Sequence, residues 1–309
     1  MVCYHPVQGW KGRVVGPSGR RPVVFNRKDG FVDLPVKVPC GQCIGCRLER
    51  SRQWAMRCIH EASLHENNSF ITLTYSDKFL PEDRSLNLRH FQLFMKRLRK
   101  KCGEGIRFYH CGEYGEKTHR PHYHACLFGH DFDDKVLFRV VNGNNLYTSS
   151  SLDGLWEKGF CTIGDVTFES AAYVARYIMK KVTGDAAEEH YERIDPETGE
   201  IIRLKPEYTT MSRGSKKLGT GGIGKGWFEK YNKDVFPWDE VIVNGVRCKP
   251  PKYYDGLFEV LDAKACLEVK RARNRQGRRH AHEQSPARLK VREKVQNARL
   301  RLLPRNLGD

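Results

Sequence analysis

The sequence lacks the features that mark several large classes of protein. It has no run of about 18 apolar residues that would predict a membrane-spanning helix. Residues 1–6 carry no signal-peptide core, and no internal repeat is present. We therefore expect a soluble, intracellular protein that does not act in a membrane.

Acidic side chains are scarce as well. Lys and Arg number 54 against 37 Asp and Glu, which gives a net charge of +17. Residues 266–309 alone hold 13 basic and 4 acidic side chains. Such a balance favours a polyanionic partner, and we expect this tail to contact phosphates.

The 11 cysteines lack the context of a disulfide framework, because their number is odd and no export signal is present. Three of them lie within seven residues: Cys40, Cys43 and Cys46. With Cys3, Cys58 or His60 as a fourth ligand, and Cys3 as our choice, they could hold a structural zinc ion. Buried or reduced thiols are the equal alternative, and an iron–sulfur cluster is a further one.

The hydrophobic pattern predicts an α+β domain built on an antiparallel sheet. The expected strands are 69–75, 106–111, 122–129 and 160–166, and the expected helices are 47–66, one from Leu88 to Leu98 and one that stops at Gly184. This order of strand, helix, three strands and helix is typical of a sheet flanked by helices.

A metal site is predicted on the strand at 122–129. His122 and His124 alternate along it, so both imidazoles lie on one face, where they could bind one divalent metal and leave positions open for a phosphate. Glu113 and Glu116 are the nearest carboxylates. We favour Glu113 as third ligand, because an antiparallel hairpin would bring it close to His122. These ligands suit Mg²⁺ or Mn²⁺. The alternative is that the histidines are ordinary strand residues.

Two tyrosines lie one helical turn apart in the last predicted helix, Tyr173 and Tyr177, with Lys180 beyond them. An apolar stripe is expected to face the core, so the tyrosines should form a separate stripe: Ala171, Val174, Ala175, Ile178 and Val182. A phenol can attack a phosphate that a metal polarises, and Lys180 could stabilise the charge. The residues therefore predict breaking and rejoining of nucleic acid through a phosphotyrosine.

These residues resemble the HUH endonuclease superfamily of rolling-circle replication initiators and relaxases. The match is closest to the initiators of gokushovirus-type microviruses, which are small single-stranded DNA phages. Three motifs carry the resemblance in the expected order: 70–75, 112–124 and 173–180. Residues 39–47 are also similar to the N-terminal region of the phage proteins.

The resemblance implies a ferredoxin-like fold in which a central antiparallel sheet carries His122 and His124 beside the tyrosine helix. It implies a nick, dependent on Mg²⁺ or Mn²⁺, at a phage origin in the host bacterial cytoplasm, with Tyr173 and Tyr177 as alternating nucleophiles. Single- and double-stranded DNA would be the partners, with no small-molecule substrate. The sequence has no G-x-x-x-x-G-K-[ST] signature, so a host replication helicase is expected as well.

We expect four segments along the chain. A Cys-rich N-terminal segment with the first helix covers 1–66, the HUH nicking and joining core covers 67–185, peripheral elements cover 186–265, and a basic C-terminal arm covers 266–309. The Gly- and Lys-rich residues 211–226 predict a mobile loop that contacts phosphate.

A competing hypothesis is a non-enzymatic, basic, zinc-containing protein that binds or packages DNA. It explains the charge and the cysteines, but it leaves the paired histidines and tyrosines as a coincidence.

Overall fold

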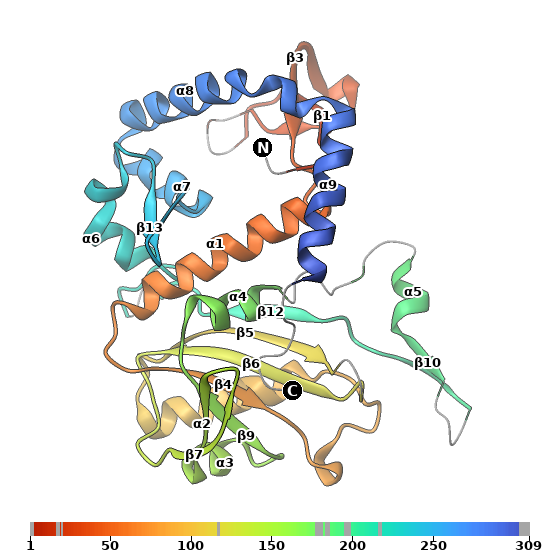
Figure 1. The fold of residues 1–309 in the computed structure, drawn as a ribbon, viewed down its shortest axis with the longest axis vertical. Coiled ribbons are helices and arrows are strands. Elements are labelled where there is room, and N and C mark those ends of the chain that lie inside the picture. The colour runs from red at the N-terminus through yellow and green to blue at the C-terminus, as the bar shows by residue number, and fades with distance from the viewer. Residues whose placement is uncertain are drawn as a thin grey trace. The chain divides into compact units, whose positions relative to one another are not determined.

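A seven-stranded, fully antiparallel sheet organises the computed structural model (Figure 1). The structure describes residues 3–16, 19, 21–115, 118–176, 182, 186–194, 199–215 and 218–302. In spatial order the strands are β12 (Tyr208–Met211), β5 (Arg107–Tyr114), β6 (Pro121–Phe128), β4 (Asn68–Leu73), β9 (Cys161–Gly164), β8 (Asn144–Thr148) and β7 (Val136–Val141). The predicted α+β class with a large antiparallel sheet is confirmed.

The described residues divide into two units. Residues 3–50 and 270–302 form the terminal unit, and residues 51–269 form the central unit. Helices α1 (Ile44–Ala62) and α8 (Ala263–Arg279) contribute residues to both units. Among the described helices, none combines the length and the apolar character needed to cross a bilayer.

One face of the sheet packs against α2 (Leu88–Cys102) and α3 (Ser150–Trp156). Side chains alternate along a strand, so this face receives every second residue of β4, β5 and β6. Its fully buried members include Ile71, Leu73, Tyr123, Leu127 and Trp156. The apolar stripe predicted for the helix at 88–98 is the stripe that α2 buries here.

The opposite face packs against α4 (Phe168–Arg176) and the second half of α1. Phe70, Tyr109 and Cys126 point to this side and are buried by Ala55 of α1 and Val174 of α4. The indole of Trp54 stacks on Tyr109 with ring centroids 4.8 Å apart. This face carries His124, and therefore the candidate site.

A third cluster covers the side of α1 that faces away from the sheet. It consists of α6 (Lys225–Val235), α7 (Lys252–Leu261) and the hairpin of β13 (Val241–Val243) and β14 (Val246–Cys248). His60 of α1 stacks on Trp227 at 3.6 Å, and its Nδ1 lies 2.8 Å from the hydroxyl of Tyr254. Burial lowers the pKa of His60 to about 4.

The remaining elements of the central unit are small. They comprise the 3-10 helix η2 (Asp77–Phe79), α5 (Ala186–Tyr191) and the hairpin of β10 (Glu192–Ile194) and β11 (Ile201–Arg203). The sequence pattern did not reveal β12, which pairs with the free edge of β5 from almost 100 residues further along the chain.

The terminal unit holds a small sheet of order β2-β1-β3, formed by β1 (Val7–Gly12), β2 (Val23–Val24) and β3 (Gly30–Val38). It also contains the 3-10 helices η1 (Arg27–Asp29) and η4 (Ala281–Gln284), and helix α9 (Pro286–Arg301). Leu289 of α9 is buried, and Glu293 lies 2.8 Å from His5.

The basic tail is therefore folded, up to residue 302, into helices that belong with the N-terminal segment. Gly277 was expected to interrupt a helix there, but α8 continues through it. A glycine costs a helix only about 1 kcal/mol, and its neighbours are long side chains that favour the helix. The break comes at η4, and Pro286 occupies the first turn of α9, where it needs no N–H partner.

Candidate functional site

The β5–β6 hairpin brings the three predicted metal ligands together. In its register, Glu113 pairs with His122, and Cys111 pairs with His124. Paired residues of antiparallel strands point to the same face, so one carboxylate and two imidazoles converge there. The predicted proximity of Glu113 to His122 is confirmed.

The ligand atoms meet at a single carboxylate oxygen. Oε1 of Glu113 lies 2.9 Å from Nε2 of His122 and 2.9 Å from Nε2 of His124. One ligand atom from each residue lies within 4.8 Å of the other two. Two imidazole nitrogens and a carboxylate oxygen at this spacing fit one divalent cation and leave further coordination positions open.

The other ring nitrogens have protein partners that fix the imidazoles. Nδ1 of His122 donates to the carbonyl oxygen of Arg120 at 3.1 Å. That bond requires a proton on Nδ1, which leaves the Nε2 lone pair for a metal. Nδ1 of His124 lies 2.9 Å from Oγ1 of Thr72 on β4, the residue that pairs with it across the strands.

Burial and charge act against each other at Glu113, whose side chain is only 1% exposed. Burial alone would raise the pKa of this carboxyl group, but the hydrogen bonds and charge of His122 and His124 lower it to about 2. The carboxylate is therefore ionised at neutral pH, as a metal ligand must be.

Tyr173 packs directly on this site. Its ring meets His124 edge-on, with centroids 5.1 Å apart, and Phe70 stacks on the same imidazole at 5.6 Å. The helical pattern predicted that Tyr173 would lie on a stripe apart from the core, and this is wrong for its ring, which is 8% exposed and belongs to the buried cluster. The reason is that α4 lies over the strands that carry the histidines.

Several predicted site residues lie outside the described residues. These are Glu116, Tyr177 and Lys180, and with them the end of the tyrosine helix near Gly184. Their roles stay predictions.

Four cysteines form a second group of metal-ligating atoms, in the terminal unit. The sulfurs of Cys3, Cys40, Cys43 and Cys46 lie within 4.8 Å of one another, and Cys3 and Cys43 are 4.0 Å apart. All 11 cysteines are free thiols. Cys3 is thus the member that joins the 40–46 group, as predicted.

Backbone N–H groups point at these sulfurs. The amide of Tyr4 donates to Cys43, that of Cys40 to Cys3, and that of Cys43 to Cys40, at 3.2 to 3.3 Å. Burial raises the pKa of Cys43, but the hydrogen bonds outweigh burial and lower it to about 7. A thiolate is the form that ligates zinc.

The other two candidates for the fourth thiol position are used elsewhere. Cys58 is fully buried against the large sheet, and His60 contacts Tyr254 and Trp227. Both residues belong to the central unit.

Sequence reasoning treated residues 70–75 only as a structural strand and so missed the role of Thr72 and Phe70. Both point to the histidine face and touch His124. The available signal was the alternation itself: every second residue of this strand, Phe70 and Thr72, had to share one face.

A cavity of about 690 Å³ opens at the end of the sheet where β6 begins. Its lining includes Arg84, His119, Arg120 and Arg193. Arg120 is held by Asp77 at 2.6 Å and by the carbonyl oxygen of Tyr75. Basic side chains therefore lie next to the strand end that carries His122.

Comparison with known proteins gives a consistent result. The family model for the replication-associated protein ORF2 matches residues 68–182, which span β4 to the tyrosine helix. No solved structure is significantly similar to the chain.

Three phage proteins are similar over most of the chain. Replication-associated protein VP4 of Bdellovibrio phage phiMH2K is 35% identical over 298 residues, which cover 90% of this chain and 86% of that protein. Replication-associated protein ORF2 of Spiroplasma virus 4 is 34% identical over 72% of this chain and 68% of its own length. Replication-associated protein ORF4 of Chlamydia phage 1 is 30% identical, over 72% of this chain and 54% of that protein.

With this extent of identity, and with the histidine hairpin and the tyrosine helix inside the matched region, the chain belongs to the family of phage replication-associated proteins, as a replication initiator of the microvirus type.

Proposed function

We propose that this protein starts rolling-circle replication by nicking one DNA strand at the phage origin and later rejoining it. The convergence of Glu113, His122 and His124 beside the ring of Tyr173 is the observation that carries the proposal. Mg²⁺ or Mn²⁺ held by these three side chains would polarise a phosphoryl oxygen of the DNA.

The chemistry is a transesterification. The phenolic oxygen of Tyr173 or Tyr177 forms a bond to phosphorus, the bond from phosphorus to the 3′ oxygen breaks, and that oxygen takes up a proton equivalent to the one the phenol loses. The 5′ end of the strand stays on the tyrosine. Attack by a free 3′ hydroxyl runs the same step backwards and reseals the strand, so no co-reactant is consumed.

The protein side chains divide this work. Glu113, His122 and His124 position the phosphate, Thr72 and the Arg120 carbonyl hold the imidazoles, and Tyr173 lies closest to them among the described tyrosines. Lys180 is proposed as a cation that stabilises developing charge. Its ammonium has no lone pair with which to attack.

A covalent-adduct assay tests the proposal. Wild-type protein with Mn²⁺ and a single-stranded origin oligonucleotide should give a protein–DNA adduct that survives denaturation, and mass spectrometry should place the DNA on Tyr173 or Tyr177. Tyr173→Phe and Tyr177→Phe should each retain one cleavage with poorer rejoining, and the double variant should form no adduct. Tyr147→Phe, on the outer strand β8, is the matched control. Attachment to any other residue contradicts the mechanism.

We also propose that the four-cysteine group holds a structural Zn²⁺. Tetrahedral zinc–thiolate bonds of about 2.3 Å put the sulfurs about 3.8 Å apart, close to the 4.0 Å between Cys3 and Cys43. Zinc analysis of protein purified without chelators should give about one ion per chain.

In the cell the proposed site of action is the host bacterial cytoplasm, and the proposed partner is a host replication helicase. The protein would cut the strand, and the helicase would unwind it.

A further inference from the structure

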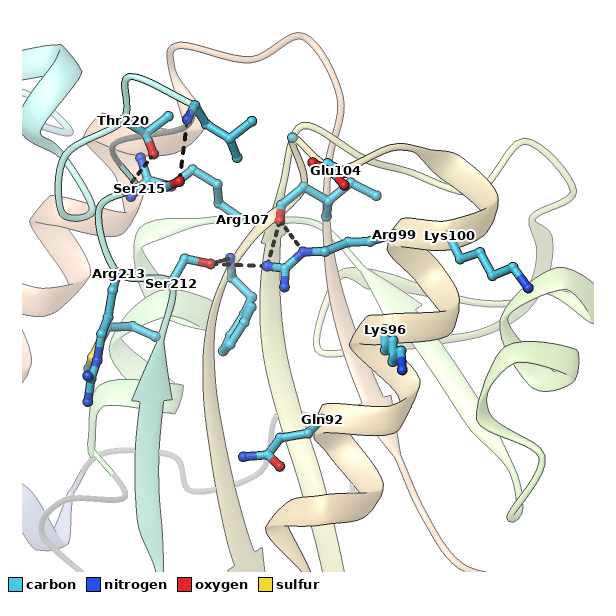
Figure 2. Close-up of a pocket in the computed structure, with 15 residues that line it drawn as sticks. Gln92, Lys96, Arg99, Lys100, Glu104, Arg107, Ser212, Arg213, Ser215 and Thr220 are labelled. Carbon is cyan, nitrogen blue, oxygen red and sulfur yellow. Dashed lines mark hydrogen bonds between the residues drawn. The ribbon is translucent and has the colours of Figure 1, made fainter.

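A basic cavity of about 730 Å³ lies in the central unit, away from the metal site (Figure 2). Three elements line it: the last turns of α2, the start of β5, and the loop that follows β12. Five cations contribute, against Glu104 as the carboxylate among the lining residues: Lys96, Arg99, Lys100, Arg107 and Arg213.

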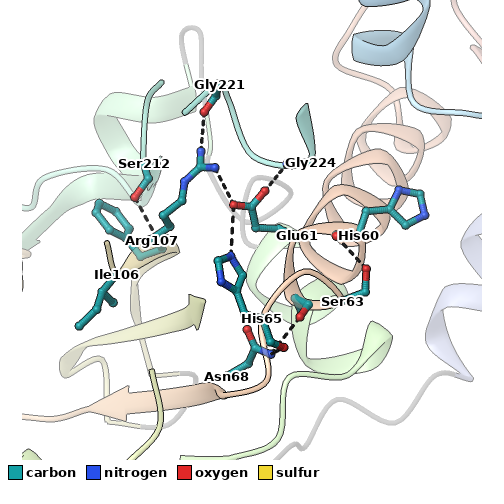
Figure 3. Close-up of polar contacts among 12 residues, drawn as sticks. His60, Glu61, Ser63, His65, Asn68, Ile106, Arg107, Ser212, Gly221 and Gly224 are labelled. Carbon is teal, nitrogen blue, oxygen red and sulfur yellow. Dashed lines mark hydrogen bonds and ion pairs between the residues drawn. The ribbon is translucent and has the colours of Figure 1, made fainter. Parts of the chain in front are cut away.

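Two of these cations are fixed in place by the protein. Arg99 donates from Nε and Nη2 to the carbonyl oxygen of Ile106, at 3.1 and 2.9 Å. Arg107 donates to Glu61 and to the carbonyl oxygen of Gly221, both at 2.6 Å (Figure 3). These contacts hold the base of the cavity.

Glu61 gives that base its rigidity. It is 1% exposed, and besides Arg107 it accepts the backbone N–H of Gly224 at 2.7 Å. Gly224 has a φ of +79°, and a Cβ there would meet the hydroxyl of Tyr254 at 2.7 Å, so a glycine is required. The loop after β12 is thus anchored to α1, which corrects the expectation of a mobile loop for its described part.

The other three cations point to a ligand. Lys96, Lys100 and Arg213 are exposed, and no described residue forms a salt bridge or hydrogen bond with their side chains. Lys96 and Lys100 are four residues apart on α2, a like-charge pair that costs the helix about 0.2–0.5 kcal/mol unless an anion lies between them.

We propose that this cavity binds backbone phosphates of the DNA that leads away from the cleavage site. The cations form a row along α2 instead of meeting at one point, which suits a chain of phosphates better than a single one. Contacts of this kind position DNA without selecting its sequence. The inference rests on the proposed DNA substrate, but not on the cleavage chemistry.

The cavity cannot hold the phosphate that is cut. Arg107 and Glu113 are six residues apart on β5, which at about 3.4 Å per residue separates them by about 20 Å. The DNA held here is therefore about six base steps from the metal site, at about 3.4 Å each.

Binding measured in EDTA tests the proposal without any cleavage. The variant Lys96→Gln/Lys100→Gln/Arg213→Gln should bind a 20-base-pair duplex of mixed sequence at least tenfold more weakly than wild type at low salt. The slope of log affinity against log salt should fall by about 2 to 3, since each lost phosphate contact removes about 0.9. Adduct formation on a saturating short oligonucleotide should be unchanged.

The matched control removes three exposed cations from other parts of the central unit, as Arg89→Gln/Lys230→Gln/Lys233→Gln. Its salt slope should change by less than one. Equal losses in the two triple variants would mean that the charge acts diffusely and would overturn the proposal. Displacement of the duplex by micromolar deoxyadenosine monophosphate would also overturn it, in favour of a nucleotide pocket.

A measurement on the wild-type protein does not depend on how the variants fold. Lysine acetylation followed by mass spectrometry should show that the duplex protects Lys96 and Lys100 but not Lys230 and Lys233. Absence of protection at Lys96 and Lys100 contradicts the proposal. A protein that shows this protection and yet forms no adduct would refute the proposed function and leave the DNA-binding cavity standing.

Discussion

Glu113 is the residue on which the candidate site depends most, because both imidazoles contact the same carboxylate oxygen. Without the negative charge, two imidazoles alone would bind a hard cation such as Mg²⁺ weakly, since that ion prefers oxygen ligands. The site thus needs a charge that is ionised although it is buried.

We expect Glu113→Gln, which preserves size and removes the charge, to weaken Mn²⁺ binding at least tenfold and to reduce adduct formation at least a hundredfold. His122→Ala and His124→Ala should do the same. Isothermal titration with Mn²⁺ measures the first effect, and the denaturing adduct assay measures the second. DNA affinity in EDTA should stay within twofold, because Lys and Arg supply it.

His190→Ala is the control, since His190 is exposed on α5 and distant in sequence from the hairpin. Full nicking by the His122→Ala/His124→Ala double variant would refute the metal hypothesis.

At the scale of secondary structure, β4 contributes to the site by pairing with β6. Thr72 faces His124 across the strands and holds its Nδ1, and hydrogen-bonded partners of this kind set ring orientation and ligand basicity. The strand is thus more than a support for the sheet.

Thr72→Val keeps the shape of the side chain and removes the hydroxyl. We expect Mn²⁺ affinity to fall tenfold or more, in the range of about 10 to 100-fold seen when such partners are lost. The fold should be retained, as checked by circular dichroism. Thr162→Val is the matched control, because Thr162 pairs with Thr72 on the neighbouring strand β9. An unchanged Mn²⁺ affinity in Thr72→Val would mean that the contact has no role in metal binding.

Helix α1 gives the central unit a dependence on pH. The pKa of His60 is lowered to about 4 by burial, against about 6.5 in the unfolded chain. Below pH 6.5 the unfolded state takes up a proton that the folded state refuses, so the free energy of unfolding falls as pH decreases from 6.5 to 4.

At pH 5 this single group should remove about 2 kcal/mol. Urea unfolding at pH 7 and pH 5 should therefore show a loss smaller by about that amount in His60→Gln than in wild type. His110, whose pKa is also lowered by burial, is present in both proteins and cancels in the comparison. The same pH dependence in wild type and variant would show that His60 is not protected from protonation.

Local contacts explain what could be predicted from the sequence. Glu113 and His122 lie nine positions apart on one hairpin, so alternation and pairing rules were enough to bring them together. The edge strand β12, the contact of Glu61 with Gly224 and the packing of α9 with the N-terminal segment join residues from about 100 to 288 positions apart. Patterns of nearby residues carry no information on such pairings. Tyr173 shows the same limit, because helical spacing gave its angle but not the element that covers it.

For the molecule as a whole, metal-binding groups lie in both units. The four cysteines belong to the terminal unit, and the ligands of the candidate nicking site belong to the central unit. Each unit can therefore lose its metal independently.

We expect Cys3→Ser to lower the zinc content below about half an ion per chain and to speed hydrogen exchange in residues 3–46, since zinc binding contributes folding energy directly. Exchange in β4, β5 and β6 should stay slow, and adduct formation on a short oligonucleotide should persist. Cys102→Ser, which changes an exposed thiol outside the group, serves as control. Wild-type protein that contains no zinc would refute the proposal for this group.

The order of elements along the chain has a consequence for synthesis on the ribosome. Glu113, His122 and His124 leave it together as one hairpin, which forms within about 10 µs, whereas Tyr173 follows His124 by 49 residues. At about 5–20 residues per second, that gap is about 2 to 10 seconds. A nascent or prematurely terminated chain would thus acquire its metal ligands while it still lacks the nucleophile, and it could not attach itself to the genome it was made to copy.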